Sequence, residues 1–393
     1  MNESELRGLA DRFGTPTYVF DERAFCARVR DVRALFGEGI TTCFSIKANP
    51  FLIPAALSEG MQLEVCSPGE LEICRARGVD SQRIVYSGVC KQATDVRAAL
   101  SYGVSVFTAE SPLQLELVNR IAAEAGKRVS VLLRLSGGSQ FGMTRADLTS
   151  CVERRGALAG VELVGIHYFV GTQRKKLRRQ RAELEMLVAL AEELEREQGW
   201  RPQRLEYGPG LAIPYFEGDD FSDTLAPARE LAGDLRQVAE RFELTVEMGR
   251  FYASTCGSYL TRVVDVKEGI DQPYAFVDGG MNHVTYVGQT MGMKVPRIRN
   301  LDAGDEVPDG RQAGPWTLCG SLCTTNDVLV RELALPLGCG DVLSFDNIGA
   351  YAVTEGVYLF LSRTMPRIVL IGEQGPVLVR DFVESWELNT PGA

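Results

Sequence analysis

The sequence has only two histidines, His167 and His283, among its 393 residues. Metal sites built on histidine need several such ligands, so the composition nearly excludes them and we expect no metal. The same scarcity disfavours a Ser-His-Asp triad. The chemistry is therefore expected to come from lysine, cysteine, carboxylates or a bound cofactor.

Positive charge and long hydrophobic runs are also scarce. The chain carries 42 Lys and Arg against 52 Asp and Glu, a net charge of −10, which disfavours nucleic-acid binding. No run approaches the roughly 18 apolar residues of a membrane helix, and the first residues do not resemble a signal peptide. The ten cysteines are scattered and form no CxxC pair, a usage typical of reduced thiols. We expect a cytoplasmic protein that binds neither nucleic acid nor membrane.

Short apolar runs alternate with helical patterns over residues 28–255. The clearest helical pattern is ELEMLVALAEELEREQ, and the eight β-like runs are TTCFSIKAN, QLEVCS, RIVYSG, SVFTAE, VSVLLRLS, VELVGIHYFVG, RLEYGPG and LTVEMGR. Eight such units predict a (β/α)₈ barrel of the TIM type, with a doubly wound α/β sheet as the competing layout. Residues 256–393 read as strands separated by Gly, Pro and Asp, which predicts a second, all-β domain. The N-terminal residues 1–27, with the strand-like PTYVFDE, are expected to join it.

Lys47 stands at the end of a β-like run, in FSIKANP. Burial lowers the pKa of a lysine towards that of a nucleophilic amine. Active sites of (β/α)₈ barrels lie at the carboxyl ends of the strands, where this residue is expected. A lysine that extends its amine to solvent at a strand end is the competing interpretation.

The lysine motif resembles that of the fold-type III pyridoxal phosphate decarboxylases, the family of diaminopimelate and ornithine decarboxylases. Seven further family motifs follow in order over about residues 44–351: Glu64-Val65-Cys66-Ser67-Pro68-Gly69-Glu70, Arg134, Gly171-Thr172-Gln173, Gly208-Pro209-Gly210, Glu247-Met248-Gly249-Arg250, Cys323 and Gly349-Ala350-Tyr351. Each motif by itself is weak evidence for the family, but the whole series in this order is specific for it. The resemblance implies an alanine racemase-like architecture, a barrel with a Greek-key-like β domain, that binds pyridoxal 5'-phosphate.

The resemblance also implies roles for these residues. Lys47 is the lysine that binds the cofactor, and Glu247 resembles the carboxylate that keeps the pyridinium nitrogen protonated. Arg134 resembles the arginine that holds this glutamate, and Arg250 belongs to the same cofactor site. A surface salt bridge between Glu247 and Arg250 is the competing explanation.

Five residues match positions that hold the cofactor phosphate: Thr172, Gly208, Gly210, Gly249 and Tyr351. Glycines let backbone N–H groups approach an anion, and a hydroxyl adds a donor. Pro209 stands where the family has a third glycine and removes one donor.

Cys323 matches the cysteine that reprotonates the substrate Cα from a partner subunit, so the resemblance implies a homodimer with composite active sites. A buried core thiol is the alternative for this residue. Thr324 and Thr325 follow it, where diamino-acid decarboxylases carry an acid that grips a distal ammonium. The loss of that acid disfavours lysine, ornithine and free diaminopimelate as substrates, unless Asn326 or Asp327 replaces it.

Other departures concern aromatic and histidine positions. Phe169 stands where the family has a histidine stacked on the cofactor; it can cover the ring but cannot carry a proton. His167, two residues earlier, lies on the same strand face and is either a ligand to cofactor or substrate or a satisfied barrel histidine. The strings DGGMNH, which contains His283, GTQ and CTT resemble those of a subgroup that acts on aminoacyl groups of acyl carrier proteins, or on other non-standard amino acids, in antibiotic and siderophore pathways. Thr324, Thr325 and His283 are then expected on the substrate side.

Six of the eight residues 174–181 are cationic. Cations at a helix N-terminus are disfavoured by the helix dipole, so Arg178, Arg179 and Arg181 are candidates for docking an acidic carrier protein. A solvated helix face is the equal alternative.

The sequence therefore predicts a pyridoxal phosphate-dependent decarboxylase of an acidic or modified amino acid, carried as an aspartyl- or glutamyl-type group on an acyl carrier protein. The first alternative is a decarboxylase of a free diamino acid. A racemase of the same fold type and a cofactor-binding regulatory protein without catalysis are the others.

Overall fold

The computed structural model describes residues 1–303 and 312–392. The chain divides into two compact units. The first consists of 26–212 and 223–252, and the second of 1–25, 213–222 and 253–393. Residues 213–222 thus belong with the second unit, which the sequence did not predict. Within that unit the Tyr215 hydroxyl lies 2.8 Å from Ser254 Oγ, and Asn347 Nδ2 donates to the Pro214 carbonyl over 2.9 Å.

Within the described residues, the first unit is a closed barrel of eight parallel strands. They are β2 (Ile40–Ser45), β3 (Gln62–Val65), β4 (Ile84–Tyr86), β5 (Val106–Ala109), β6 (Val129–Arg134), β7 (Val161–Phe169), β8 (Arg204–Gly208) and β9 (Glu243–Met248). β9 pairs with β2, with Cys43 opposite Glu247, and closes the barrel. All eight predicted runs form strands, so the (β/α)₈ prediction is confirmed and the doubly wound layout is wrong.

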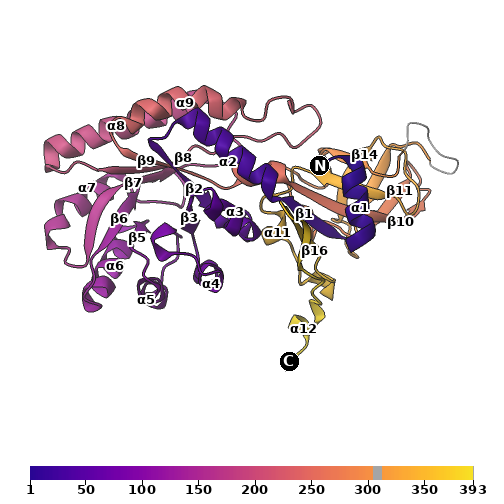
Figure 1. Ribbon diagram of the computed structural model, residues 1–393, viewed down its shortest axis with the longest axis horizontal. Helices are drawn as coiled ribbons and strands as arrows, with labels where there is room; N and C mark the ends of the chain where they lie inside the picture. The colour runs from indigo at the N-terminus through magenta and orange to yellow at the C-terminus, as the bar shows by residue number, and fades with distance from the viewer. Residues whose placement is uncertain (304–311, 393) are drawn as a thin grey trace. The chain divides into compact units, whose positions relative to one another are not determined.

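Helices cover the outside of the barrel (Figure 1). They are α2 (Glu22–Phe36), α3 (Ile53–Ser58), α4 (Pro68–Ala76), α5 (Ala93–Tyr102), α6 (Pro112–Glu124), α7 (Arg145–Glu153), α8 (Arg178–Gln198) and α9 (Ala226–Ala239). Helices α4 and α6 begin with the same N-cap motif. Ser67 and Ser111 each follow a strand, precede a proline and cap the helix with the side-chain oxygen. These caps turn the chain sharply at the carboxyl ends of β3 and β5.

In the second unit, nine strands of the described residues form one sheet in the order β14-β13-β11-β10-β1-β16-β17, with β15 paired to β10 and β12 to β15. They are β1 (Thr17–Asp21), β10 (Gly257–Lys267), β11 (Tyr274–Val277), β12 (Ile298–Asn300), β13 (Trp316–Cys319), β14 (Val328–Leu333), β15 (Val342–Asp346), β16 (Arg367–Gly372) and β17 (Gly375–Arg380). The PTYVFDE segment supplies β1, which pairs with β10 and β16, as predicted.

The prediction of an all-β second domain missed a helix at its start. α1 (Glu3–Phe13) has an Asn2 capping box and packs Leu6, Leu9 and Phe13 into the core of this unit against Val19 and Val369. Its apolar residues recur at helical spacing, so the sequence does carry a local signal for this helix. Short helices α10 (Arg250–Ala253), α11 (Ala352–Glu355) and α12 (Trp386–Asn389) complete the fold.

Candidate active site

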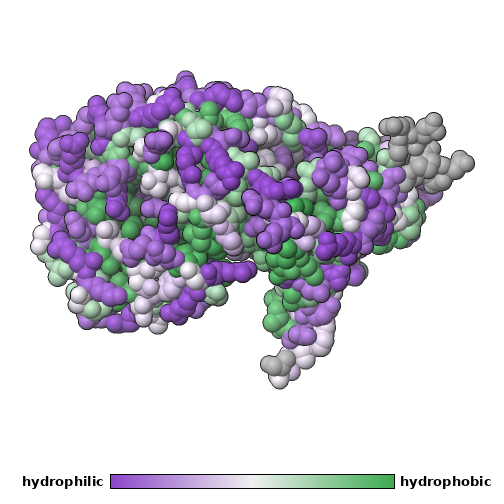
Figure 2. Space-filling view, in the orientation of Figure 1, coloured by the Kyte–Doolittle hydropathy of each residue, from purple (hydrophilic) through white to green (hydrophobic). Residues whose placement is uncertain are grey.

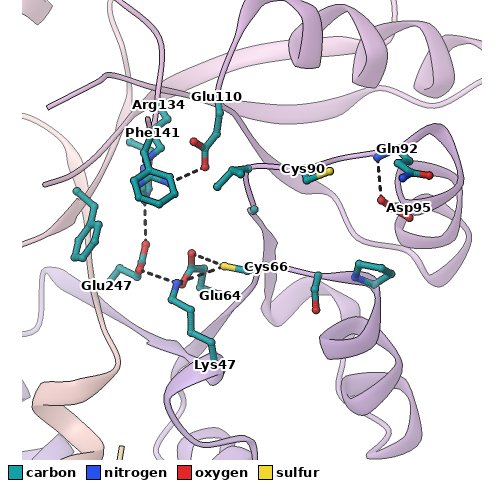
Figure 3. Close-up of a pocket in the computed structure, with 16 residues that line it drawn as sticks. Lys47, Glu64, Cys66, Cys90, Gln92, Asp95, Glu110, Arg134, Phe141 and Glu247 are labelled. Atoms are coloured by element: carbon teal, nitrogen blue, oxygen red, sulfur yellow. Dashed lines mark hydrogen bonds and ion pairs between the residues drawn. The ribbon is translucent and has the colours of Figure 1, made fainter. Parts of the chain in front are cut away.

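Lys47 lies in a single 3₁₀ turn directly after β2. Its Nζ donates to Glu64 Oε2 over 2.5 Å and to Cys66 Sγ over 3.4 Å, and lies 4.0 Å from Glu247 Oε1. The Glu64 side chain is only 4% exposed, whereas that of Lys47 is 38% exposed. The amine is therefore held between two buried carboxylates but remains reachable, as Figure 3 shows.

Glu247, near the end of β9, is held as an anion inside the barrel. Ser45 Oγ donates to its Oε1 over 2.8 Å, and His167 Nε2 lies 3.0 Å from its Oε2. Burial opposes ionisation, but the hydrogen bond from His167 and the charge of Lys47 outweigh it and hold the pKa of Glu247 below its usual value. A buried carboxylate of this kind suits a protonated ring nitrogen.

Arg134 has a different partner from the expected one. Its Nη1 donates to Glu110 Oε1 over 2.6 Å, and its guanidinium lies 4.9 Å from the centre of the Phe141 ring. His167, rather than Arg134, contacts Glu247. The reason is that Arg134 ends β6, where the loop after β5 brings Glu110 beside it. The expectation that Arg134 holds Glu247 is replaced by an Arg134–Glu110 pair in the same cavity wall.

These residues line one cavity of about 760 Å³ at the carboxyl ends of the strands. Lys47, Arg134, His167, Phe169 and Glu247, five residues expected at the cofactor, all line it. Opposite them, Cys90, Gln92 and Asp95 form the wall after β4 (Figure 3). The structure thus brings together the residues predicted to surround the cofactor ring.

The predicted phosphate-binding residues of the barrel also meet. Arg250 Nε donates to Thr172 Oγ1 over 3.1 Å. Gly210 has a φ of +61°, and a Cβ there would lie 1.8 Å from the Gly171 carbonyl oxygen, so only glycine fits this close approach.

Gly208 faces the aromatic ring expected to cover the cofactor. A Cβ on Gly208 would lie 2.4 Å from Phe169 Cδ2, and one on Gly249 would lie 2.8 Å from the Ala48 Cβ. The missing side chains let the strand ends of β8 and β9 approach the turn after β7 and the Lys47 turn. A narrow, glycine-lined space beside a hydroxyl and a guanidinium is suited to a phosphate.

The other predicted residues belong to the sheet unit. Cys323 is exposed, Thr324 is half-buried and Thr325 is exposed. Tyr351 has a φ of +70° at the start of α11. The roles of these four residues toward cofactor and substrate stay predictions.

His283 is enclosed within the sheet unit. Its Nδ1 lies 2.8 Å from the Tyr259 hydroxyl and its Nε2 lies 3.0 Å from Asn282 Nδ2. Burial lowers the pKa of His283 to about 3. With both ring nitrogens engaged and the side chain buried, this environment favours a structural role over the expected contact with substrate.

The cationic segment is divided in the structure. Arg174 pairs with Glu183, and Arg181 Nε lies 3.0 Å from Asp234 Oδ2. Arg178 and Arg179 are exposed in the first turn of α8, which contains no acid. Figure 2 shows a largely hydrophilic surface along this helix. Two of the three predicted docking residues are therefore available at the surface, whereas Arg181 has an intramolecular partner.

Sequence reasoning gave no role to several residues of the site. Glu64 and Cys66 belong to a family motif but have no predicted role, and Ser45, Glu110 and Phe141 have none either. Burial raises the pKa of Cys66 well above its usual value, so this thiol is neutral beside Lys47. Glu64 and Glu110 each lie at or just after the end of a barrel strand, the signal that had identified Lys47.

Comparison with known proteins shows the family and the fold of this chain. Residues 22–254 match the family of pyridoxal-dependent decarboxylases, in its pyridoxal binding domain. The chain is 33% identical to the diaminopimelate decarboxylase of Pseudomonas aeruginosa, covering 94% of this chain and 91% of that protein. It is 27% identical to the L-glutamyl-[BtrI acyl-carrier protein] decarboxylase of Niallia circulans, covering 94% and 92%. The crystal structure of diaminopimelate decarboxylase from M. jannaschii in complex with L-lysine superposes with a TM-score of 0.87, at 24% identity, over 98% of this chain and 94% of that one.

The chain belongs to the pyridoxal-dependent decarboxylases. It is a carboxy-lyase of the amino-acid decarboxylase class, and its cofactor is pyridoxal phosphate. The site fits this group, because the cavity offers an amine for the aldehyde and a buried carboxylate for the ring nitrogen, and the glycine-lined space next to Phe169 suits the phosphate. No helix of the described residues is long and apolar enough to cross a membrane.

Proposed function

We propose that this decarboxylase acts on a free diamino acid of the diaminopimelate type. The observation that carries the catalytic part is the Lys47 amine, held 2.5 Å from Glu64 and 4.0 Å from Glu247 in a cavity at the carboxyl end of the barrel. The similarity to the diaminopimelate decarboxylase of Pseudomonas aeruginosa supports the substrate class.

Six residues have defined tasks in this proposal. When bound, pyridoxal phosphate supplies the electron-accepting ring that makes loss of the α-carboxylate possible. Lys47 binds the cofactor, Glu247 holds the proton on the ring nitrogen, and Phe169 covers one ring face. Thr172 and Arg250 hold the phosphate. Cys323, exposed in the sheet unit, delivers the proton to Cα.

The distal end of such a substrate needs a polar partner. Asp327 is not free to serve, because it accepts hydrogen bonds from the Met281 and Leu322 backbone N–H groups, each over 2.7 Å, and is 2% exposed. Asn326 is exposed and remains the partner for a distal ammonium in this proposal. An amide oxygen binds an ammonium less strongly than a carboxylate does.

This commitment of Asp327 favours a second candidate, an acidic aminoacyl group on an acyl carrier protein. That substrate has no distal ammonium to bind. The exposed Arg178 and Arg179 supply positive charge for an acidic carrier, and the Niallia circulans relative acts on a carrier-bound glutamyl group. Antibiotic biosynthesis is the pathway type that this candidate implies.

A decarboxylation assay separates the two candidates. Release of carbon dioxide is measured from free diaminopimelate, lysine and ornithine, and from aspartate and glutamate loaded on an acyl carrier protein. Turnover of a free diamino acid with none from the carrier forms supports the first proposal. Turnover confined to the carrier forms contradicts it and supports the second. Racemisation at Cα without carbon dioxide release contradicts both.

We also infer that the active form is a homodimer in the cytoplasm. Hydrophobic side chains are exposed in the sheet unit near α11, where Figure 2 shows hydrophobic residues gathered. They include Val357, Leu359, Phe360 and Leu361, each at least 45% exposed. An apolar group of this kind is typical of a protein interface.

A further inference from the structure

A third carboxyl group lies inside the barrel and has no part in the mechanism above. Glu206 is 2% exposed in the middle of β8. It lies opposite His167 on β7 and Thr245 on β9. Thr245 precedes Glu247 by two residues and so shares its face of the strand. A ring nitrogen of His167 and one carboxylate oxygen from each of Glu206 and Glu247 all lie within 4.8 Å of one another.

Two carboxylates this close in a buried site cannot both be ionised at neutral pH. Glu247 has stabilising partners for its negative charge in Ser45, His167 and Lys47. Glu206 has fewer, since its buried Oε1 has no hydrogen-bond partner in the described part of the chain, and of these three groups only the charge of Lys47 acts on it. Of the two carboxyl groups, Glu206 is therefore the one whose surroundings favour the protonated form. Burial raises the pKa of Glu206 well above its usual value, and the charge of Glu247 and a hydrogen bond to it raise it further.

A second cavity, of about 110 Å³, reaches Glu206 from the opposite end of the barrel. Its wall contains the first residues of β3, β4, β5, β8 and β9, so it lies at the amino-terminal ends of the strands. Thr41, Gln62 and Gln82 give it a polar lining beside Glu206. A water needs only about 10–15 Å³ and a few polar partners, so this cavity has room for several.

We propose that Glu206 is a positioning residue that acts as a neutral carboxylic acid, donating a hydrogen bond to Glu247 and exchanging its proton with water in the cavity at the base of the barrel. In this arrangement the carboxylate that meets the cofactor ring is fixed from below, away from the substrate. The buried carboxyl pair carries one negative charge in total, which matches the single positive charge of a protonated ring. The inference rests on the cofactor site at Glu247, but its first tests need no cofactor.

The first test is infrared spectroscopy of the apoprotein at about pH 8. The carbonyl stretch of a protonated carboxyl group is expected in the wild type and should disappear in Glu206→Gln. Glu162→Gln, an exposed residue of β7, is the matched control and should keep the band. Absence of the band from the wild type overturns the proposal, and this measurement stands even if the variant fails to fold.

The second test is the pH dependence of stability of the apoproteins. A carboxyl group whose pKa is raised by folding binds its proton more tightly in the folded state, so it lowers stability as pH rises above its unfolded value of about 4.3. Glu206→Gln removes this loss. The difference in Tm between Glu206→Gln and wild type should grow from about pH 5 to about pH 8. A constant difference contradicts a neutral Glu206.

Other charged or titratable groups face Glu206 and can also change stability with pH. These groups are Cys43 on β2, Lys47 after it, Glu64 on β3, His167 on β7 and Glu247 on β9, with Arg204 and Glu243 at the cavity below. All of them are retained in Glu206→Gln, so a change specific to this variant belongs to Glu206.

The third test measures the dissociation constant of pyridoxal phosphate. Glu206→Met removes the donor and should weaken binding about tenfold or more, whereas Glu206→Gln keeps an N–H donor and should restore most of the affinity. The absorbance of the bound cofactor should titrate at a shifted pH in the Met variant only. Equal behaviour of the two variants would show that Glu206 only fills space. A failure of wild-type protein to bind pyridoxal phosphate would instead contradict the cofactor assignment.

Discussion

Lys47 and Glu247 depend on each other inside the barrel. The amine lies 4.0 Å from the carboxylate, and each charge reduces the cost of burying the other. The neutral thiol of Cys66 and the carboxylate of Glu64 complete the surroundings of the amine. At the scale of single residues, the positive charge of Lys47 is thus offset by the negative charges of Glu64 and Glu247.

Replacing Lys47 by alanine should abolish the absorbance band of covalently held cofactor and reduce decarboxylation by at least about a hundredfold, because the attaching amine is lost. An absorbance spectrum and a carbon dioxide assay check both. Lys267→Ala, an exposed lysine of β10, is the control and should keep the band. A variant at position 47 that retains the band would show that another amine holds the cofactor.

His283 should make the sheet unit sensitive to acid. It is neutral in the fold, with a pKa of about 3, but binds a proton below about pH 6.5 when unfolded. Because the unfolded chain then holds the extra proton, stability should fall by up to about 1.4 kcal/mol per pH unit as pH drops below 6.5. Urea unfolding of wild type and His283→Gln at several pH values measures this. The same slope in both proteins would contradict the prediction.

At the scale of elements, the start of α8 is unusual. Arg178 and Arg179 occupy its first turn without an acid to offset the helix dipole. Two neighbouring cations are instead paired with acids of the same chain. Arg174 pairs with Glu183, and Arg181 pairs with Asp234. Within this segment, Arg178 and Arg179 are therefore exposed cations at the start of the helix.

Changing both Arg178 and Arg179 to glutamine should stabilise the protein by about 0.3–1 kcal/mol for each residue, because unfavourable charges leave the helix N-terminus. If a carrier protein docks here, turnover of a carrier-bound substrate should fall while turnover of a free one is unchanged. Unfolding curves and steady-state kinetics provide the two measurements. Arg128→Gln with Arg201→Gln is the matched control, since both are exposed elsewhere on the barrel. An equal effect on both substrates would contradict the docking role and show that these arginines belong to a solvated helix face.

At the scale of the whole molecule, the barrel holds Lys47 and the sheet unit holds Cys323. A dimer with composite sites is expected to combine the two from different chains. The exposed hydrophobic residues near α11 support association.

Mixing the inactive variants Lys47→Ala and Cys323→Ala tests this arrangement. In a composite dimer, a mixed pair contains one intact site, so random exchange should restore roughly a quarter of wild-type activity. Each variant alone should be at least about a hundredfold slower than wild type. Native mass spectrometry with one variant isotopically labelled confirms exchange in the same samples. Mixed dimers without restored activity would place both residues of a site on one chain.

The sequence predicted much of this arrangement because its signals were local. Eight apolar runs sufficed for the barrel, and ordered motifs led to Lys47, Glu247 and the residues predicted to bind the phosphate. It did not predict the partner of Arg134, since a guanidinium pairs with the nearest carboxylate in space and Glu110 lies 24 residues away along the chain. It also missed α1, although the apolar residues of this helix recur at helical spacing.

The sequence by itself therefore determined the barrel, the family and the chemical groups available, because periodicity and motif order are properties of the chain. Only the tertiary structure decided which of those groups pair with one another and which are protonated. It placed His167 and Glu206 beside Glu247, buried His283 with both nitrogens engaged, and committed Asp327 to two backbone N–H groups. The physical reason is that burial and distance between residues remote in sequence fix protonation and pairing, and neither is written in any local pattern.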